Sequence, residues 1–275
     1  MNGTHEEIRS YAVWMAGEPL AATTYGEHVA WLADELGYEP YEPEGYPVAG
    51  GTGRLNDVNP RLTIRTLNRL SPGDDPTAGK FLRKCAVWMY AGHGAMARQA
   101  DGYPYNMSYL QFMIPGEWDK PDRERTGIWA GYELAEKQRY SIDKFDLNHV
   151  RLAYLMACFS AGGSERKDDG TVWTVAHNDS VAAHFKSRGA KAVIGFRQRV
   201  HAYLNSGWSD PKPSDRPYMR FHETFWGAVC KGTTVYKAYR DAWDEIRDTW
   251  NTEYPDSAVY PVLFGGKGIK ITPSR

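Results

Sequence analysis

Four short segments of the chain consist almost wholly of apolar residues. They are Tyr11–Ala16, residues 85–91, residues 150–158, in which only Arg151 is charged, and Ala192–Phe196. An apolar run without alternation is typical of a strand covered on both faces, as in a parallel sheet, although a buried helix has the same pattern. Because each run is short and flanked by glycine or charged residues, we expect four buried strands.

Apolar residues recur at helical spacing in five further segments. In chain order these are residues 24–37, 58–70, 178–188, 218–230 and 235–250. The first opens with the capping-box pattern Thr24-x-x-Glu27, whereas the second carries only a weak signal. In the third, Val181, Ala182 and Phe185 share one face of the expected helix.

The alternation of these segments predicts the fold class. The helix over 178–188 lies between two of the expected strands and completes a β–α–β unit, and residues 259–264 have the pattern of a last strand. We therefore expect an α/β fold, organised as a three-layer α/β/α sandwich with a mostly parallel central sheet. One domain over 1–275 is expected, with an insertion or lid at 97–148.

Composition narrows the function classes. The chain has 275 residues, of which 42% are hydrophobic and 24% charged, with a net charge of −1, as in an ordinary soluble globular protein. Such a charge gives no attraction to nucleic acid or an anionic membrane. No run is long enough to span a membrane, and the first ten residues lack the signal-peptide pattern, so we expect a cytoplasmic protein.

Two of the apolar runs lead directly into residues that carry chemistry. The run at 85–91 is followed by Gly92-His93-Gly94, and the run at 150–158 ends in Ala157-Cys158. In open α/β sheets, sites form at the carboxyl ends of the strands. If these two strands are neighbours, about 4.8 Å apart, His93 and Cys158 can meet.

This pair of side chains suits acyl transfer. A thiolate is a strong nucleophile, and a nearby imidazole activates it and then protonates the leaving amine. The tetrahedral oxyanion needs preorganised donors, for which the N–H groups of Gly94 and Cys158 are candidates. We expect His93 and Cys158 to be catalytic, while the residues that bind substrate are not identified by the sequence.

Plainer interpretations compete with this one. A lone cysteine at a strand end is usually a core thiol, and a histidine beside glycine is usually a turn residue. The joint pattern, in this order, is much less expected by chance. Cys85 and Cys230 fit core positions. Five other histidines have neither a paired nucleophile nor metal-ligand spacing, so no metal and no cofactor are expected: His149, His177, His184, His201 and His222.

At these residues the sequence resembles the caspase-like superfamily of cysteine peptidases, which includes caspases, gingipains, clostripain and bacterial CHAT-domain proteins. The resemblance lies in the segments 90–94, Tyr-Ala-Gly-His-Gly, and 155–160, Leu-Met-Ala-Cys-Phe-Ser, and continues in a helix and a Val-Ile-Gly strand up to about 246. It implies a caspase-hemoglobinase-like fold and a dyad of His93 and Cys158. It also implies an oxyanion hole at Gly94 and Cys158, and a protein or peptide substrate. Family members are often switched on by a partner, ligand, calcium or cleavage.

The resemblance is less informative about specificity. Met156 stands where caspases have glutamine, so an aspartate preference is not supported. Bacterial relatives often cleave after Arg or Lys through an acidic pocket residue; Asp101 and Asp179 are candidates for it, although each also fits a solvated surface position. Residues 164–170 are expected to form an exposed loop, where Arg166 or Lys167 is a candidate for self-cleavage, against the alternative of a plain solvated loop.

Three alternatives stay open at this point. The chain fits a catalytically silent caspase-like module that binds a partner, and it fits a cysteine hydrolase that acts on a non-peptide amide or ester. A metal enzyme fits least. The aromatic-rich segments 103–112 and 118–132 are compatible with a lid, a binding surface or core.

Overall fold

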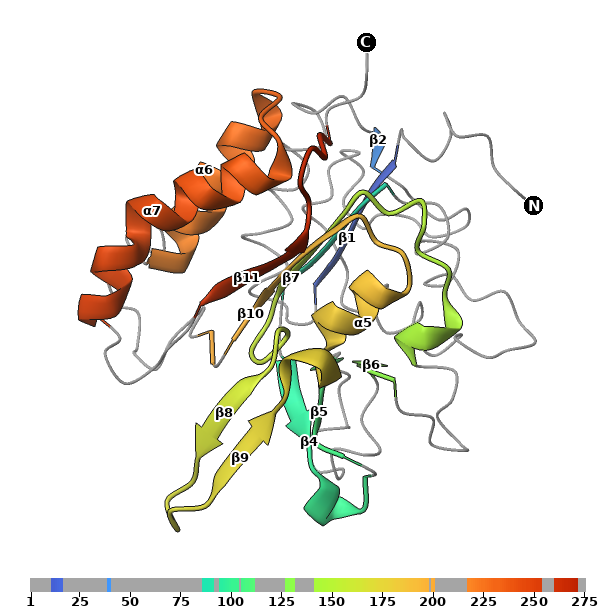
Figure 1. Ribbon diagram of the computed structural model, residues 1–275, viewed down its shortest axis with the longest axis vertical. Helices are drawn as coiled ribbons and strands as arrows, with labels where there is room; N and C mark the ends of the chain where they lie inside the picture. Colours follow the sequence, from blue (N-terminus) through green and yellow to red (C-terminus); the bar gives the residue numbers. More distant parts are fainter. Residues whose placement is uncertain are drawn as a thin grey trace, which may run out of the picture.

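The computed structural model describes residues 11–16, 39–40, 86–91, 94–103, 105–111, 127–131, 141–197, 199–200, 217–253 and 260–271. The helices expected over 24–37 and 58–70 lie outside these ranges, as do Cys85, His93 and His201. The described part is a mixed α/β structure built on a central six-stranded sheet (Figure 1).

The sheet has the strand order β11-β10-β7-β3-β1-β2. Every neighbouring pair in it is parallel except β10 and β11, which are antiparallel. All four apolar runs form strands of this sheet, so the prediction of a mostly parallel sheet is confirmed. The strands are β1 (Tyr11–Ala16), β2 (Glu39–Pro40), β3 (Val87–Ala91), β7 (Leu152–Met156), β10 (Ala192–Phe196) and β11 (Pro261–Gly265).

Both faces of β7 and β10 are buried, which explains their uninterrupted apolar runs. Along β7, Tyr154 and Met156 point into a core shared with α6 (Pro217–Cys230) and α7 (Val235–Glu253). The alternate residues join a second core with α5 (Val181–Ser187). Figure 1 shows α6 and α7 together on one side of the sheet and α5 on the other.

The three described α-helices follow the sequence pattern closely. Ser180 caps α5 by accepting a hydrogen bond from the N–H of Ala183, and the buried face of α5 is the predicted one. Along α7, Ala238, Ala242 and Ile246 are buried at intervals of about one turn. Gly232 has a positive φ of 81° between α6 and α7, which favours glycine at the end of a helix.

The sequence did not indicate a second, three-stranded sheet. It consists of β4 (Gly94–Ala97), β5 (Met107–Gln111) and β6 (Gly127–Trp129), all antiparallel. Of the aromatic-rich segments, Tyr103, Tyr109 and Trp129 are buried, and the rings of Tyr109 and Trp129 stack with centroids 4.0 Å apart. These described aromatic residues therefore belong to the core. Short 3-10 turns lie at Gln99–Asp101, Ile142–Lys144 and His177–Asp179.

The exposed loop expected over 164–170 is found only in part. Residues 164–166 belong to β8 (Gly163–Arg166), which forms an antiparallel hairpin with β9 (Val172–Val175), and residues 168–170 are exposed in the turn between these strands. This turn is closed by a hydrogen bond from the N–H of Lys167 to the carbonyl of Thr171, and Gly170 takes a φ of 85° there. The Asp169-Gly170 pair is a hairpin signal that explains the difference.

Candidate functional site

The carboxyl ends of β3 and β7 meet, as the candidate site requires. Their parallel register pairs Ala91 with Met156, the last residue of each strand. Beyond these ends, Gly94 begins β4 and Cys158 lies in the turn after β7. A Cβ atom added at Gly94 would lie 2.0 Å from the carbonyl oxygen of Cys158, so the two backbones are in direct contact. The structure therefore brings Gly94 and Cys158 together, whereas His93 is outside the described residues.

The Cys158 turn has an unusual backbone. Phe159, the next residue, has a φ of 55°, and it is the one non-glycine residue with positive φ in the described part of the chain. Such a conformation is costly and persists only where neighbouring contacts impose it, which happens most often at functional sites. Two hydrogen bonds close the turn, from Ser160 N–H to Ala157 O at 3.3 Å and from Gly162 N–H to Phe159 O at 2.8 Å.

Ser160 fastens this turn to the sheet. Its fully buried hydroxyl lies within hydrogen-bond distance of the carbonyl oxygens of Leu155 and Ala157, at 2.8 and 2.9 Å. It also accepts a hydrogen bond of 2.8 Å from the N–H of Phe196 at the end of β10. Sequence reasoning gave Ser160 no role, although a small hydroxyl residue shortly after the candidate nucleophile was a usable signal.

Cys158 is a partly buried residue, and its thiol has close polar neighbours. Its Sγ atom donates a hydrogen bond to the carbonyl of Val200 at 3.5 Å and accepts one from the Val200 N–H at 3.2 Å. Burial raises the pKa of this thiol, while the Val200 backbone, the charge of Arg199 and the Gly94 backbone act in the opposite direction. The described surroundings therefore favour the neutral thiol.

Charged residues of the β8–β9 hairpin are linked to Arg199, whose charge acts on the Cys158 thiol. The carboxylate of Glu165 forms ion pairs with Arg199 and with Lys167, the latter at 2.7 Å. Two cations lie over the ring of Trp173 on β9, Arg98 at 3.8 Å and Lys167 at 4.2 Å from its centroid. In Figure 1, the hairpin and β4 leave the central sheet at the same end.

Neither Asp179 nor Asp101, the two candidates for recognising a basic substrate residue, has a described contact with the Cys158 thiol. Asp179 ends a 3-10 turn and, with Asp143, raises the pKa of Tyr105, after the larger effect of burial. Asp101 lies in another 3-10 turn, and its side chain is outside the description. The described contacts of the Cys158 thiol do not include Asp179.

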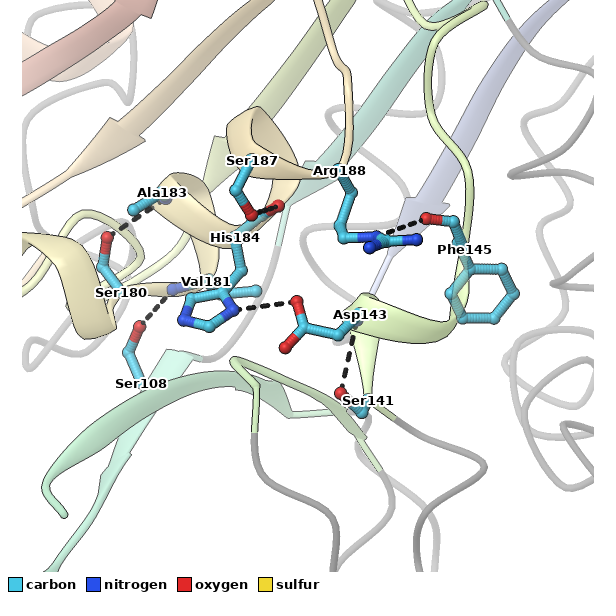
Figure 2. Close-up of polar contacts among 10 residues, drawn as sticks. All are labelled: Ser108, Ser141, Asp143, Phe145, Ser180, Val181, Ala183, His184, Ser187 and Arg188. Carbon is cyan, nitrogen blue, oxygen red and sulfur yellow. Dashed lines mark hydrogen bonds and ion pairs between the residues drawn. The ribbon is translucent and has the colours of Figure 1, made fainter.

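A separate polar cluster joins α5 to the segment that precedes β7 (Figure 2). The Nδ1 atom of His184 lies 2.9 Å from a carboxylate oxygen of Asp143, a pairing that the sequence did not indicate. Ser108 accepts a hydrogen bond from the N–H of Val181 in the same region. These contacts anchor the first turns of α5, and we assign the cluster a structural role.

The other residues considered from sequence have ordinary positions. Cys230 ends α6 and packs against the core, as expected. His222 is fully buried, and its ring lies edge-on to Tyr154. His177 stacks on Phe264. Over the described ranges, no three His, Cys, Asp or Glu side chains are grouped to hold a metal ion, and none of the helices found there is long and apolar enough to cross a membrane.

The sequence matches no protein-family model, and no curated protein is significantly similar to it. The function of this chain must therefore be argued from its own residues and contacts.

Proposed function

We propose that the chain is a cysteine endopeptidase that uses Cys158 as nucleophile and His93 as general acid and base. The observation that supports this best is the direct contact of the Gly94 and Cys158 backbones at the carboxyl ends of β3 and β7. The two sequence motifs therefore converge at one sheet edge, where α/β proteins carry their sites. We propose with it a three-layer, caspase-hemoglobinase-like arrangement and a protein or peptide substrate.

The proposed reaction has two acyl-transfer steps. His93 takes the proton of Cys158, and the thiolate sulfur attacks the carbonyl carbon of the scissile bond. The oxyanion that forms is stabilised by the N–H groups of Gly94 and Cys158. The C–N bond then breaks, the amine leaves with the proton from His93, and a thioester to Cys158 remains. Water, deprotonated by His93, hydrolyses the thioester, and the thiol regains its proton.

A catalytically silent module that binds a partner is the second candidate. The observation that favours it is the state of the thiol, which is hydrogen-bonded to Val200 and has a raised pKa. A nucleophile in this state is poorly ionised at neutral pH. The two proposals differ in one respect, which is whether Cys158 forms an acyl intermediate.

Hydrolysis of fluorogenic peptides that vary at P1 tests the proposal. We expect the wild type to cleave at least one group of peptides, and the Cys158→Ala and His93→Ala variants to lose this activity. Cys230→Ala is the matched control, since Cys230 ends α6 and lies outside the two sequence motifs, and this variant should retain activity. The same experiment tests the proposed preference for Arg or Lys at P1. Equal hydrolysis by wild type and Cys158→Ala would contradict the proposal.

A further inference from the structure

Val200, one of the described residues, is hydrogen-bonded to the thiol of Cys158 through both of its backbone polar groups. The carbonyl of Val200 accepts the S–H proton at 3.5 Å, and the N–H of Val200 donates to the sulfur at 3.2 Å. Val200 is only 8% exposed, so its backbone is packed in this position. One peptide segment therefore engages both the proton and a lone pair of the sulfur, at the atom that must approach a substrate carbonyl.

Arg199 ties this segment to the β8–β9 hairpin. Its guanidinium is paired with the carboxylate of Glu165 on β8, the strand that follows the Cys158 turn. The Glu165 side chain is 12% exposed, whereas that of Arg199 is 54% exposed. A carboxylate withdrawn from water depends on its cation more than a surface carboxylate does. The ion pair therefore holds the Val200 backbone where it covers the thiol.

We propose that Arg199 and Val200 form a cover that keeps Cys158 in a closed state, and that the ion pair between Arg199 and Glu165 is its latch. The inference rests on the proposed function, because it regulates the nucleophile of that reaction. In the closed state the Val200 backbone is hydrogen-bonded to the thiol and limits the access of water and substrate to the sulfur. Opening the latch frees the sulfur for water and substrate.

The latch is sensitive to anything that competes for its two charges. Arg199 is half exposed, so dissolved ions reach it. Screening is already strong at 0.1 M salt, where the Debye length is about 10 Å. We therefore expect the cover to open more often as the salt concentration rises, and an acidic group on a substrate or partner to act in the same way.

The rate at which iodoacetamide alkylates Cys158 measures how often the cover is open, and the measurement requires no peptidase activity. The rate is followed by mass spectrometry of the peptide that contains Cys158. We expect Glu165→Gln to raise this rate about two- to fivefold, the range that corresponds to an ion pair of this exposure. The wild-type rate should rise with salt, and the Glu165→Gln rate should not.

Three controls separate a latch from general loosening. Lys167→Gln removes the other ion pair of Glu165, at 2.7 Å, but leaves Arg199 in place, so the Cys158 rate should stay at the wild-type value. In the double variant Glu165→Gln/Arg199→Gln, Cys158 should be alkylated no faster than in the faster of the two single variants, because both substitutions break the same ion pair. Cys230 in the same sample is a second partly buried thiol that packs against the same core, so a rise at both cysteines indicates general loosening.

The outcomes distinguish the latch from the peptidase proposal. An unchanged Cys158 rate in Glu165→Gln, or a rise matched by Cys230, overturns the latch whatever the peptide assays show. A selective rise at Cys158 supports the latch even if no variant cleaves any peptide, and in that case the peptidase proposal fails alone. A third outcome is that wild type and Glu165→Gln hydrolyse peptides equally and that their Cys158 alkylation rates are also equal. This outcome supports the peptidase proposal and contradicts the latch.

Discussion

At the scale of single residues, the site depends on the close approach of two backbones. Gly94 lies against Cys158, and Ser160 fixes the turn in which Cys158 and the positive-φ Phe159 lie. Position 94 must be glycine because there is no space for a Cβ atom beside Cys158. Position 160 requires a small residue that carries a hydroxyl group, because this group is buried and bonded to Phe196. Substitutions at these two positions should therefore affect Cys158 without touching its side chain.

Gly94→Ala should displace the Cys158 turn. Its new Cβ would lie 2.0 Å from a backbone oxygen, which cannot give way as a flexible side chain can. We expect a loss of about 1–3 kcal/mol in the free energy of unfolding, the usual cost of overpacking, and altered alkylation of Cys158. Denaturant unfolding measures the first effect. Gly227→Ala is the control, since no atom lies within 4 Å of its added Cβ, and it should be neutral or stabilising.

Ser160→Ala should leave the buried N–H of Phe196 without its partner. The cost of an unpaired buried donor is about 1–3 kcal/mol in the free energy of unfolding. Ser187→Ala removes an exposed hydroxyl that bonds to the His184 carbonyl on α5, and should change stability by less than about 0.5 kcal/mol. Similar unfolding midpoints for the two variants would show that Ser160 does not fasten the turn.

The pH dependence of Cys158 alkylation follows from the direction of its pKa shift. Burial raises the pKa of this thiol and outweighs the Val200, Arg199 and Gly94 effects, so the rate should reach half-maximum above the ordinary thiol value of about 8.5. A thiol whose pKa is raised by folding stabilises the protein below its unfolded pKa, and this contribution is lost as pH rises through the folded pKa. A midpoint below that of a free thiol would instead indicate an ion pair with an imidazolium.

At the scale of elements, the sheet and the helices bring the site together through ordinary burial. Uninterrupted apolar runs predicted the strands because both faces of β7 and β10 are covered, and the stripe on α7 predicted its packing. The β8–β9 and β4–β5 hairpins were not predicted. Their strands are short, and β8 reads Gly-Ser-Glu-Arg, without apolar alternation, so tertiary contacts rather than local pattern determine them.

Ile246→Ala tests the packing of α7 against the sheet. Ile246 is fully buried in the core that also holds Met156, and Cys158 packs against the same core. Removing its side chain should cost about 2–5 kcal/mol in the free energy of unfolding. Asp248→Ala, on the same helix but with a side chain 93% exposed, is the control and should change stability by less than about 0.5 kcal/mol. Equal effects would contradict the assignment of this face to the core.

At the scale of the whole molecule, the site combines contacts of two kinds. The convergence of Gly94 and Cys158 could be predicted, because neighbouring parallel strands end at the same edge. The contacts of Val200 with the thiol and of Arg199 with Glu165 could not, since they join segments far apart in the sequence and neither segment has a distinctive pattern. The same holds for the pairing of His184 with Asp143.

The central claim is that Cys158 forms an acyl intermediate with the help of His93, and covalent labelling tests it most directly. Wild type, His93→Ala and the Glu165→Gln variant are each treated with peptidyl acyloxymethyl ketones that carry Lys, Arg, Asp or Leu at P1, and intact mass is measured. The account predicts one peptidyl group on Cys158 in wild type, faster labelling in Glu165→Gln, and none in His93→Ala, although iodoacetamide still modifies Cys158 there. Modification of Cys158 by iodoacetamide in all three proteins, with no peptidyl adduct in any of them, would contradict it.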